Sequence, residues 1–170
     1  MRTISRSPEG RVLAWILENV DPALPVLDLG CGVGTYLNSL PNADRTGVDT
    51  HGPYLEELAE GITRIHGDMR LCAPVCRGVV TFVDSLEHIP KHDGSALVEM
   101  VQITAKTVLI FAPVGPHENE PCDGNENQRH LSEWYPEDLE AMGFRVLSDP
   151  DFHVSNPEGK RAAMFARWDA

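Results

Sequence analysis

The sequence of 170 residues has the length of one domain, placed over residues 1–170, and its 42% hydrophobic residues are enough for a buried core. Its 26 acidic and 14 basic residues give a formal net charge of −12, which disfavours attraction to nucleic acid or anionic lipid. Apolar runs such as 108–114 are far shorter than the roughly 20 residues of a membrane span, and no signal-peptide pattern opens the chain, so we expect a cytoplasmic protein without a membrane partner.

Helix and strand patterns alternate along the chain. Ser7 before Pro8 and Glu9 is typical of a helix start, and the almost wholly apolar runs 78–83 and 108–112 are typical of central parallel strands. The expected elements, in order, are a helix from Ser7 that ends before Pro22, strand 26–29, helix 35–40, strand 45–48 ending at Asp49, helix 54–59, strand 62–66, strand 78–83, a helix capped by Asp93, strand 108–112, a long loop 113–129, a helix from Pro136 that ends at Gly143, and strands 144–147 and 162–168 joined by a turn at 156–159. Five β–α alternations and a C-terminal β-hairpin predict an α/β fold, a doubly wound, mostly parallel sheet with helices on both faces.

The most informative residues directly follow the strands, because ligands of such sheets bind at the carboxyl ends of the strands. Gly30, Gly32 and Gly34 stand at alternate positions after the first strand, where glycine lets the backbone turn sharply and approach a ligand. The second strand ends at Asp49, whose carboxylate can accept both ribose hydroxyls of an adenosine. A dehydrogenase would favour Gly-x-Gly-x-x-Gly, and position 35 is Thr35, which disfavours that alternative.

Five segments together resemble the motifs of class I methyltransferases that depend on S-adenosylmethionine (SAM). Residues 26–34 resemble the first motif of that family and 47–49 its acidic second motif. Residues 67–69 are similar to the segment that meets adenine, 83–89 to the fourth-strand motif, and 142–144 to the usual entry into the terminal hairpin. The resemblance implies a Rossmann-like, seven-stranded sheet with one antiparallel strand, SAM as the cofactor and S-adenosylhomocysteine as the product.

The same resemblance implies which residues hold the cofactor. The glycines would line its methionine part, Asp49 would hold the ribose, and the backbone of 84–86 would close the pocket floor. The implied set is Asp28, Gly30, Cys31, Gly32, Gly34, Asp49, Thr50, Asp68, Met69, Asp84, Ser85 and Leu86, with Asp68 and Met69 at the adenine. Compared with that family, we expect almost no extra helices before the first strand and no inserted cap domain, so substrate contacts must come from few elements or from a second subunit of a homo-oligomer.

Methyl transfer requires alignment of the acceptor with an activated methyl group, and a base where the acceptor is a hydroxyl. His88 is the candidate catalytic base, because its usual pKa lies near neutrality; the alternative is a ring that only packs beside SAM or hydrogen-bonds the loop. We predict transfer to a small polar acceptor, with oxygen as the favoured atom. A catalytically inactive adenosine-binding module is the alternative from another class.

A metal is a further alternative. Asp84, Glu87, His88 and His130 are a mixed set of carboxylates and imidazoles, which suits zinc, manganese or iron. They resemble the metal site of the methyltransferases that modify the 3′-terminal 2′-hydroxyl of small RNAs, although Asp84 stands where those enzymes have Glu. The alternative function is therefore a metal-assisted RNA 2′-O-methyltransferase with a divalent metal as cofactor; the acidic chain, however, has no obvious RNA surface.

The loop 113–129 is long enough for a lid over the site. Arg129, His130, Trp134 and Tyr135 follow it as a polar and aromatic group that is a candidate binding site for a ring-shaped acceptor. The alternative is that Trp134 and Tyr135 pack the last helix.

Overall fold

The computed structural model describes residues 7–72, 76–117, 120–121, 124–152 and 162–170. Its elements, with three short 3₁₀ turns written η, are α1 (Pro8–Asn19), β1 (Val26–Leu29), η1 (Leu37–Ser39), β2 (Arg45–Asp49), α2 (Gly52–Glu56), β3 (Thr63–His66), α3 (Met69–Cys72), β4 (Val79–Val83), η2 (Leu86–His88), α4 (Lys91–Gln102), β5 (Thr107–Pro113), η3 (Glu126–Gln128), α5 (Pro136–Ala141), β6 (Arg145–Asp149) and β7 (Ala163–Asp169). No helix in these described ranges is long and apolar enough to cross a membrane.

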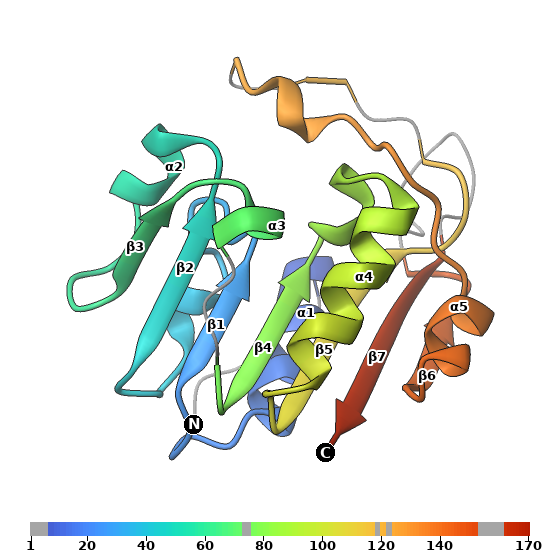
Figure 1. Ribbon diagram of the computed structural model, residues 1–170, viewed down its shortest axis with the longest axis horizontal. Coiled ribbons are helices and arrows are strands. Elements are labelled where there is room, and N and C mark those ends of the chain that lie inside the picture. The colour runs from blue at the N-terminus through green and yellow to red at the C-terminus, as the bar shows by residue number, and fades with distance from the viewer. Residues whose placement is uncertain (1–6, 73–75, 118–119, 122–123, 153–161) are drawn as a thin grey trace.

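Seven strands form one sheet in the order β3-β2-β1-β4-β5-β7-β6 (Figure 1). Strands β1 to β5 run parallel to one another, and β7 runs antiparallel to both β5 and β6. The predicted doubly wound, mostly parallel sheet with a C-terminal hairpin is therefore confirmed. The turn expected at 156–159 lies outside the described residues.

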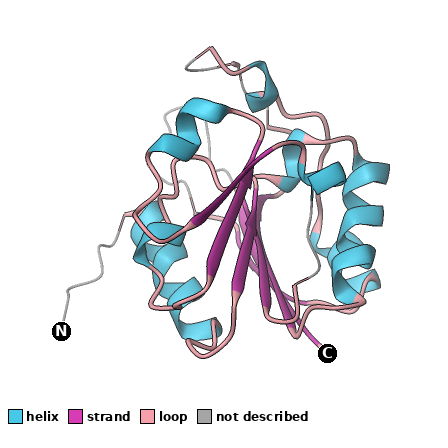
Figure 2. Ribbon diagram, turned by 60° about the vertical axis from the view of Figure 1, so that its left-hand side comes forward, coloured by secondary structure: helices cyan, strands magenta, loops and turns pink. Residues whose placement is uncertain are grey.

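Two hydrophobic layers cover the sheet, because alternate side chains of a strand point to opposite faces. In β4, Val80 and Phe82 pack with the core that contains the α4 residues Leu97 and Val98. Val79 and Val83 pack into the opposite core, which contains Val12 and Ile16 of α1. Helices α3, α4 and α5 therefore cover one face while α1, η1 and α2 cover the other, and Figure 2 shows helices on both sides of the strands.

The sheet changes direction between β1 and β4. The chain runs outward from β1 to β2 and β3, then returns to place β4 on the other side of β1. Helices that follow these two strands lie on opposite faces, so a crevice opens at their carboxyl ends. This crevice is where the predicted glycine loop and the segment 84–88 meet.

Two predicted helices are shorter than expected. In each case an arginine donates hydrogen bonds to backbone carbonyls of the helical segment. Instead of a helix over 35–40, only the turn η1 forms, and Arg45 Nη1 contacts the carbonyls of Leu37 and Leu40 at 3.2 and 3.1 Å. Helix α2 ends at Glu56, and Arg64 Nε donates to the carbonyl of Leu55 at 2.8 Å. These contacts, which come from the strand that follows each helical segment, replace helical hydrogen bonds, and periodicity alone does not reveal them.

The cap predicted for α4 is wrong. The helix begins at Lys91 after Pro90, and Asp93 lies inside its first turn. Asp93 instead pairs with Arg70 of α3, a helix that the sequence analysis did not predict.

Helix α4 packs closely on Trp134 through Gly94. A Cβ added at Gly94 would lie 2.7 Å from Cζ2 of the Trp134 ring, which is 1% exposed. We expect Gly94→Ala to lower the melting temperature, because overpacking a rigid ring costs about 1–3 kcal/mol while alanine gains only about 1 kcal/mol of helix propensity. Thermal unfolding followed by circular dichroism measures this, with Glu99→Ala on the exposed side of the same helix as the control. A Gly94→Ala variant more stable than wild type would contradict the close packing.

Candidate active site

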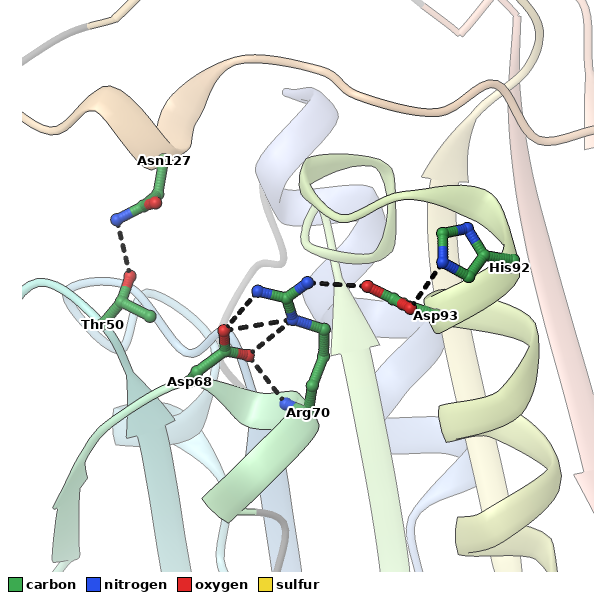
Figure 3. Close-up of polar contacts among 6 residues, drawn as sticks. All are labelled: Thr50, Asp68, Arg70, His92, Asp93 and Asn127. Carbon is green, nitrogen blue, oxygen red and sulfur yellow. Dashed lines mark hydrogen bonds and ion pairs between the residues drawn. The ribbon is translucent and has the colours of Figure 1, made fainter.

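A cavity of about 500 Å³ opens at the carboxyl ends of β1, β2 and β4. The loop around η3 forms its roof, with Asn125, Asn127 and Gln128 among the lining residues (Figure 1). Asn127 Nδ2 donates to Thr50 Oγ1 at 3.1 Å, so the roof is joined to the end of β2 (Figure 3). The predicted site residues that line the cavity are Asp28, Gly30, Cys31, Gly32, Asp49, Thr50, Asp68, Met69, Asp84, Ser85 and His88.

Two members of the predicted cofactor set are not among the lining residues. Leu86 is fully buried in the core that contains Trp134. Gly34 closes the glycine loop, where an added Cβ would meet the side chains of Leu58 and Asn38 at 2.4 and 2.9 Å. Both residues lie behind the cavity wall rather than in it.

The glycine loop approaches β4 closely. Gly30 has a φ of +77°, and a Cβ added there would lie 2.5 Å from Ser85 Cβ. Gly32 has a φ of +53° with open space where its Cβ would point. Asp49 supports this loop, since its Oδ2 accepts from Gly32 N and its Oδ1 from His51 N, both at 2.8 Å. The loop and the end of β2 thus form one unit, with Gly32 as the open position.

Asp28 is the most deeply buried acid beside the glycine loop. It is 4% exposed and accepts a hydrogen bond from Thr81 Oγ1 at 2.6 Å. Burial raises its pKa to about 6, an effect that the Thr81 hydrogen bond reduces and the Asp49 charge increases. Burial also raises the pKa of the neighbouring Cys31 thiol, which argues against a thiolate nucleophile.

Asp84 follows β4 in a strained conformation. It has a φ of +48°, and among the described residues it is the only one besides glycine with a positive φ. Its side chain is open to the cavity, yet the surrounding protein deprives the carboxylate of bulk water. Burial, followed by the charge of Glu9, raises its pKa to about 7. Strain and desolvation at one carboxylate are typical of functional sites.

Glu87, His88 and His130 form a compact group next to Asp84. Three ligand atoms, one from each residue, all lie within 4.8 Å of one another. The backbone carbonyl of Glu87 accepts from Leu131 N and Ser132 N at 2.8 and 3.1 Å, and this holds His130 near His88. The two imidazole rings stand 4.8 Å apart between centroids.

The Glu87 carboxyl group is buried without full hydrogen bonding. It is 2% exposed, and its Oε2 has no hydrogen-bond partner in the described part of the chain. Burial, then the charge of Asp84, raises its pKa well above the usual value. Asp84 does not belong to the compact group, so the structure brings together three of the four predicted metal ligands.

His88 lines the cavity as an imidazole held by the following loop. Its Nδ1 lies 3.2 Å from the carbonyl of Arg129, which only accepts hydrogen bonds. Nδ1 therefore carries the proton in the neutral ring, and Nε2 has the lone pair. Burial lowers the pKa of His88, partly offset by the Arg129 carbonyl, so the neutral form is favoured at pH 7.

The candidate acceptor group, by contrast, is dispersed. Trp134 is 1% exposed in the core, and Tyr135 donates to Glu133 at 2.9 Å at the start of α5. Lys91 Nζ lies 4.9 Å from the centroid of the Trp134 ring and pairs with Asp138, so these aromatics join α4 to α5. Arg129 faces Glu120 and Glu126 at the surface. Two members of the group reach the site: the His130 ring stands beside the His88 ring, and Arg129 contacts His88 through its backbone carbonyl.

Sequence reasoning missed several lining residues. Glu9 of α1, Tyr36 and Tyr54 line the cavity, as do Arg70 and Asn127. None belongs to a strand end, and they reach the cavity through helix packing and loop folding. Only Arg70 could have been found from the sequence, because it stands two positions after Asp68, a predicted contact of adenine.

Solved structures of methyltransferases resemble the chain. Magnesium protoporphyrin IX methyltransferase from Synechocystis PCC 6803, with bound S-adenosylhomocysteine, is 19% identical with a TM-score of 0.65, over 95% of this chain and 82% of that one. The CcbJ methyltransferase from Streptomyces caelestis is 17% identical with a TM-score of 0.66, over 98% and 97%. The small RNA methyltransferase HEN1 is 17% identical with a TM-score of 0.62, over 100% of this chain and 27% of that one.

At these identities the likeness establishes the fold, which is that of methyltransferases solved with SAM or S-adenosylhomocysteine. No protein-family model matches the chain, and no curated protein does. Its activity therefore has to be argued from the cavity.

Asp28 predicts a pH-dependent stability. Because its folded-state pKa is raised from 3.8 to about 6, the fold favours the protonated form and loses stability as pH rises between these values. The neutral asparagine amide keeps an acceptor for Thr81, so we expect Asp28→Asn to stabilise the protein by about 3 kcal/mol at pH 7.5 and by less at pH 4.5. Unfolding by urea at both pH values measures this.

The matched control for this experiment is Asp149→Asn. Arg11 lowers the pKa of Asp149, so its stabilising effect is present above pH 4 and lost as pH falls. This variant should lose stability at pH 7.5, the opposite direction from Asp28→Asn. An equal effect of Asp28→Asn at both pH values would contradict the assignment.

Proposed function

We propose that the chain binds SAM and transfers its methyl group to a small polar acceptor, with oxygen as the favoured atom. The supporting observation is one cavity that unites the open glycine loop, Asp49 and Asp68 at the point where the sheet changes direction. Its volume of about 500 Å³ falls in the range of small-molecule sites. The same methyltransferase fold in cofactor-bound structures supports the proposal.

Each end of the cavity has groups suited to one part of that cofactor. By resemblance, the Gly30–Gly32 backbone would line the methionine part and Asp49 the ribose. Asp68 and Met69 would hold the adenine. The bound cofactor would supply a methyl group already activated as a sulfonium. Asp28 and Asp84 place carboxyl groups at the cavity wall, and in their ionised form these would favour a cationic ligand.

The chain's own contribution is alignment and removal of a proton. The roof residues and Ile89 line the cavity, and we propose that they limit the access of water once the cofactor is bound. We propose that His88, neutral at pH 7 with its lone pair on Nε2, accepts the proton of an acceptor hydroxyl.

Gly32 allows a direct test of the cofactor. An added Cβ at Gly32 meets nothing within 4 Å and stands at the cavity wall, so Gly32→Ala should fold but block close approach of a ligand. We expect wild type to bind S-adenosylhomocysteine in calorimetry, and Gly32→Ala to weaken binding at least about tenfold (about 1.4 kcal/mol). Gly61→Ala is the control, since Gly61 also has a positive φ (+84°) and open space, but lies outside the cavity. Equal affinities for Gly32→Ala and wild type, or no binding by wild type, would reject the proposal.

A metal-assisted RNA 2′-O-methyltransferase is the second candidate. The observation that favours it is the compact group of Glu87, His88 and His130, in which Glu87 Oε2 has no partner within the described residues. Two imidazoles and a carboxylate fit zinc, manganese or iron, and a metal there would polarise an acceptor hydroxyl. The resemblance in fold to HEN1 supports it, whereas the net charge of −12 opposes an RNA acceptor.

Glu87→Gln tests the metal. The amide keeps the shape of the side chain but is a poor ligand, so the fold should persist while metal affinity falls at least about tenfold. Calorimetric titration of the dialysed protein with Mn²⁺ and Zn²⁺ measures this. Glu133→Gln, an exposed acid outside the group, is the control. Equal affinities of wild type and Glu87→Gln for Mn²⁺ and for Zn²⁺ would reject the metal site, as would the absence of binding of both ions to wild type.

A further inference from the structure

Arg70 spans the mouth of the cavity between two elements that are distant in sequence. Its Nε lies 3.0 and 3.1 Å from the two carboxylate oxygens of Asp68, and its Nη2 also contacts Asp68 (Figure 3). Its Nη1 donates to Asp93 Oδ2 at 2.6 Å in the first turn of α4. The guanidinium thus joins the turn after β3 to the helix on the far side of the crevice.

These contacts fix the orientation of the Asp68 carboxylate. The Arg70 backbone N–H donates to Asp68 Oδ1 at 2.9 Å, in addition to the side-chain contacts. A planar guanidinium that contacts both carboxylate oxygens sets the plane of that carboxylate, which a single point charge cannot do. Asp93 holds the other edge of the guanidinium, so Arg70 itself has a fixed position.

The same contacts favour the ionised form of Asp68. The hydrogen bonds from Arg70 lower the pKa of Asp68, against a smaller opposing effect of burial. An ionised carboxylate only accepts hydrogen bonds. It therefore suits the 6-amino group of adenine, which donates, and disfavours the 6-oxo group of a hypoxanthine ring, which accepts.

We propose that Arg70 is a positioning residue that holds the Asp68 carboxylate as a fixed acceptor and makes the cavity select a 6-aminopurine over a 6-oxopurine cofactor. This inference rests on the proposed function, since it places the adenine of SAM at Asp68. It gives Arg70 a role in the recognition of adenine. Arg70 itself lies just outside residues 67–69, the segment that resembles the adenine-binding motif.

The test compares two ligands that differ only at this group, S-adenosylhomocysteine and its deaminated analogue S-inosylhomocysteine. Calorimetry gives both affinities for wild type, Arg70→Met and Arg70→Lys. We expect wild type to prefer the adenosyl ligand about 10- to 100-fold, the value of one hydrogen bond to a charged group. In Arg70→Met this ratio should fall below about fivefold, because the adenosyl ligand loses more affinity than the inosyl one. Arg70→Lys, which keeps the charge without the planar contact, should give an intermediate ratio.

The control is Arg145→Met, which removes an exposed arginine paired with Asp169 away from the cavity and should leave the ratio unchanged. A ratio in Arg70→Met equal to that of wild type, or an equal loss for both ligands, indicates a structural role and overturns the inference alone. If wild type binds neither ligand, the proposed function fails, and the inference with it. If Arg70→Met does not fold, Arg70→Lys provides the test. A ratio of adenosyl to inosyl affinity in Arg70→Lys equal to that of wild type also overturns the inference.

Discussion

The close approach of Gly30 to Ser85 is the constraint on which the site depends. A Cβ at Gly30 would lie 2.5 Å from Ser85 Cβ, so the end of β1 passes β4 where no side chain fits. This approach places the glycine loop and the segment that follows β4 against the same cavity. Asp49 adds the end of β2 by accepting from Gly32 N. Three strand ends therefore share one cavity because one position has no side chain.

The carboxylates in and beside this cavity cost stability in the free protein. Asp28, Asp84 and Glu87 all have raised pKa values with burial as the largest cause. Ionisation of each is disfavoured, and Asp84 also adopts a strained backbone conformation. A core selected only for stability would replace these groups with apolar ones. Their presence together is physically consistent with a ligand that brings positive charge, whether a sulfonium or a metal ion.

The sequence predicts the strand ends well and the loop side chains poorly, for physical reasons. Gly30, Asp49 and Asp68 stand at or just after the carboxyl ends of parallel strands, which meet at one edge of the sheet, so local pattern was enough to place them beside one cavity. Trp134, in contrast, looked available for an acceptor until the structure placed it against Gly94 in the core. For an aromatic residue in a loop, no local sequence periodicity distinguishes a buried from an exposed side chain. The early end of α2 depends likewise on a side chain outside the helix, that of Arg64 in β3, which donates to the carbonyl of Leu55.

Side-chain pairs between segments distant in sequence connect the elements around the cavity. Asn127 joins the roof to Thr50, 77 residues away, and Arg70 joins the turn after β3 to Asp93 of α4. Each pair joins two segments that follow different strands of the sheet (Figure 3). Exposed polar pairs add little to stability, because solvent screens them and ordering both side chains costs entropy. Their effect is therefore on the position of side chains at the cavity, while the sheet beneath keeps the glycine loop and Asp49 in place.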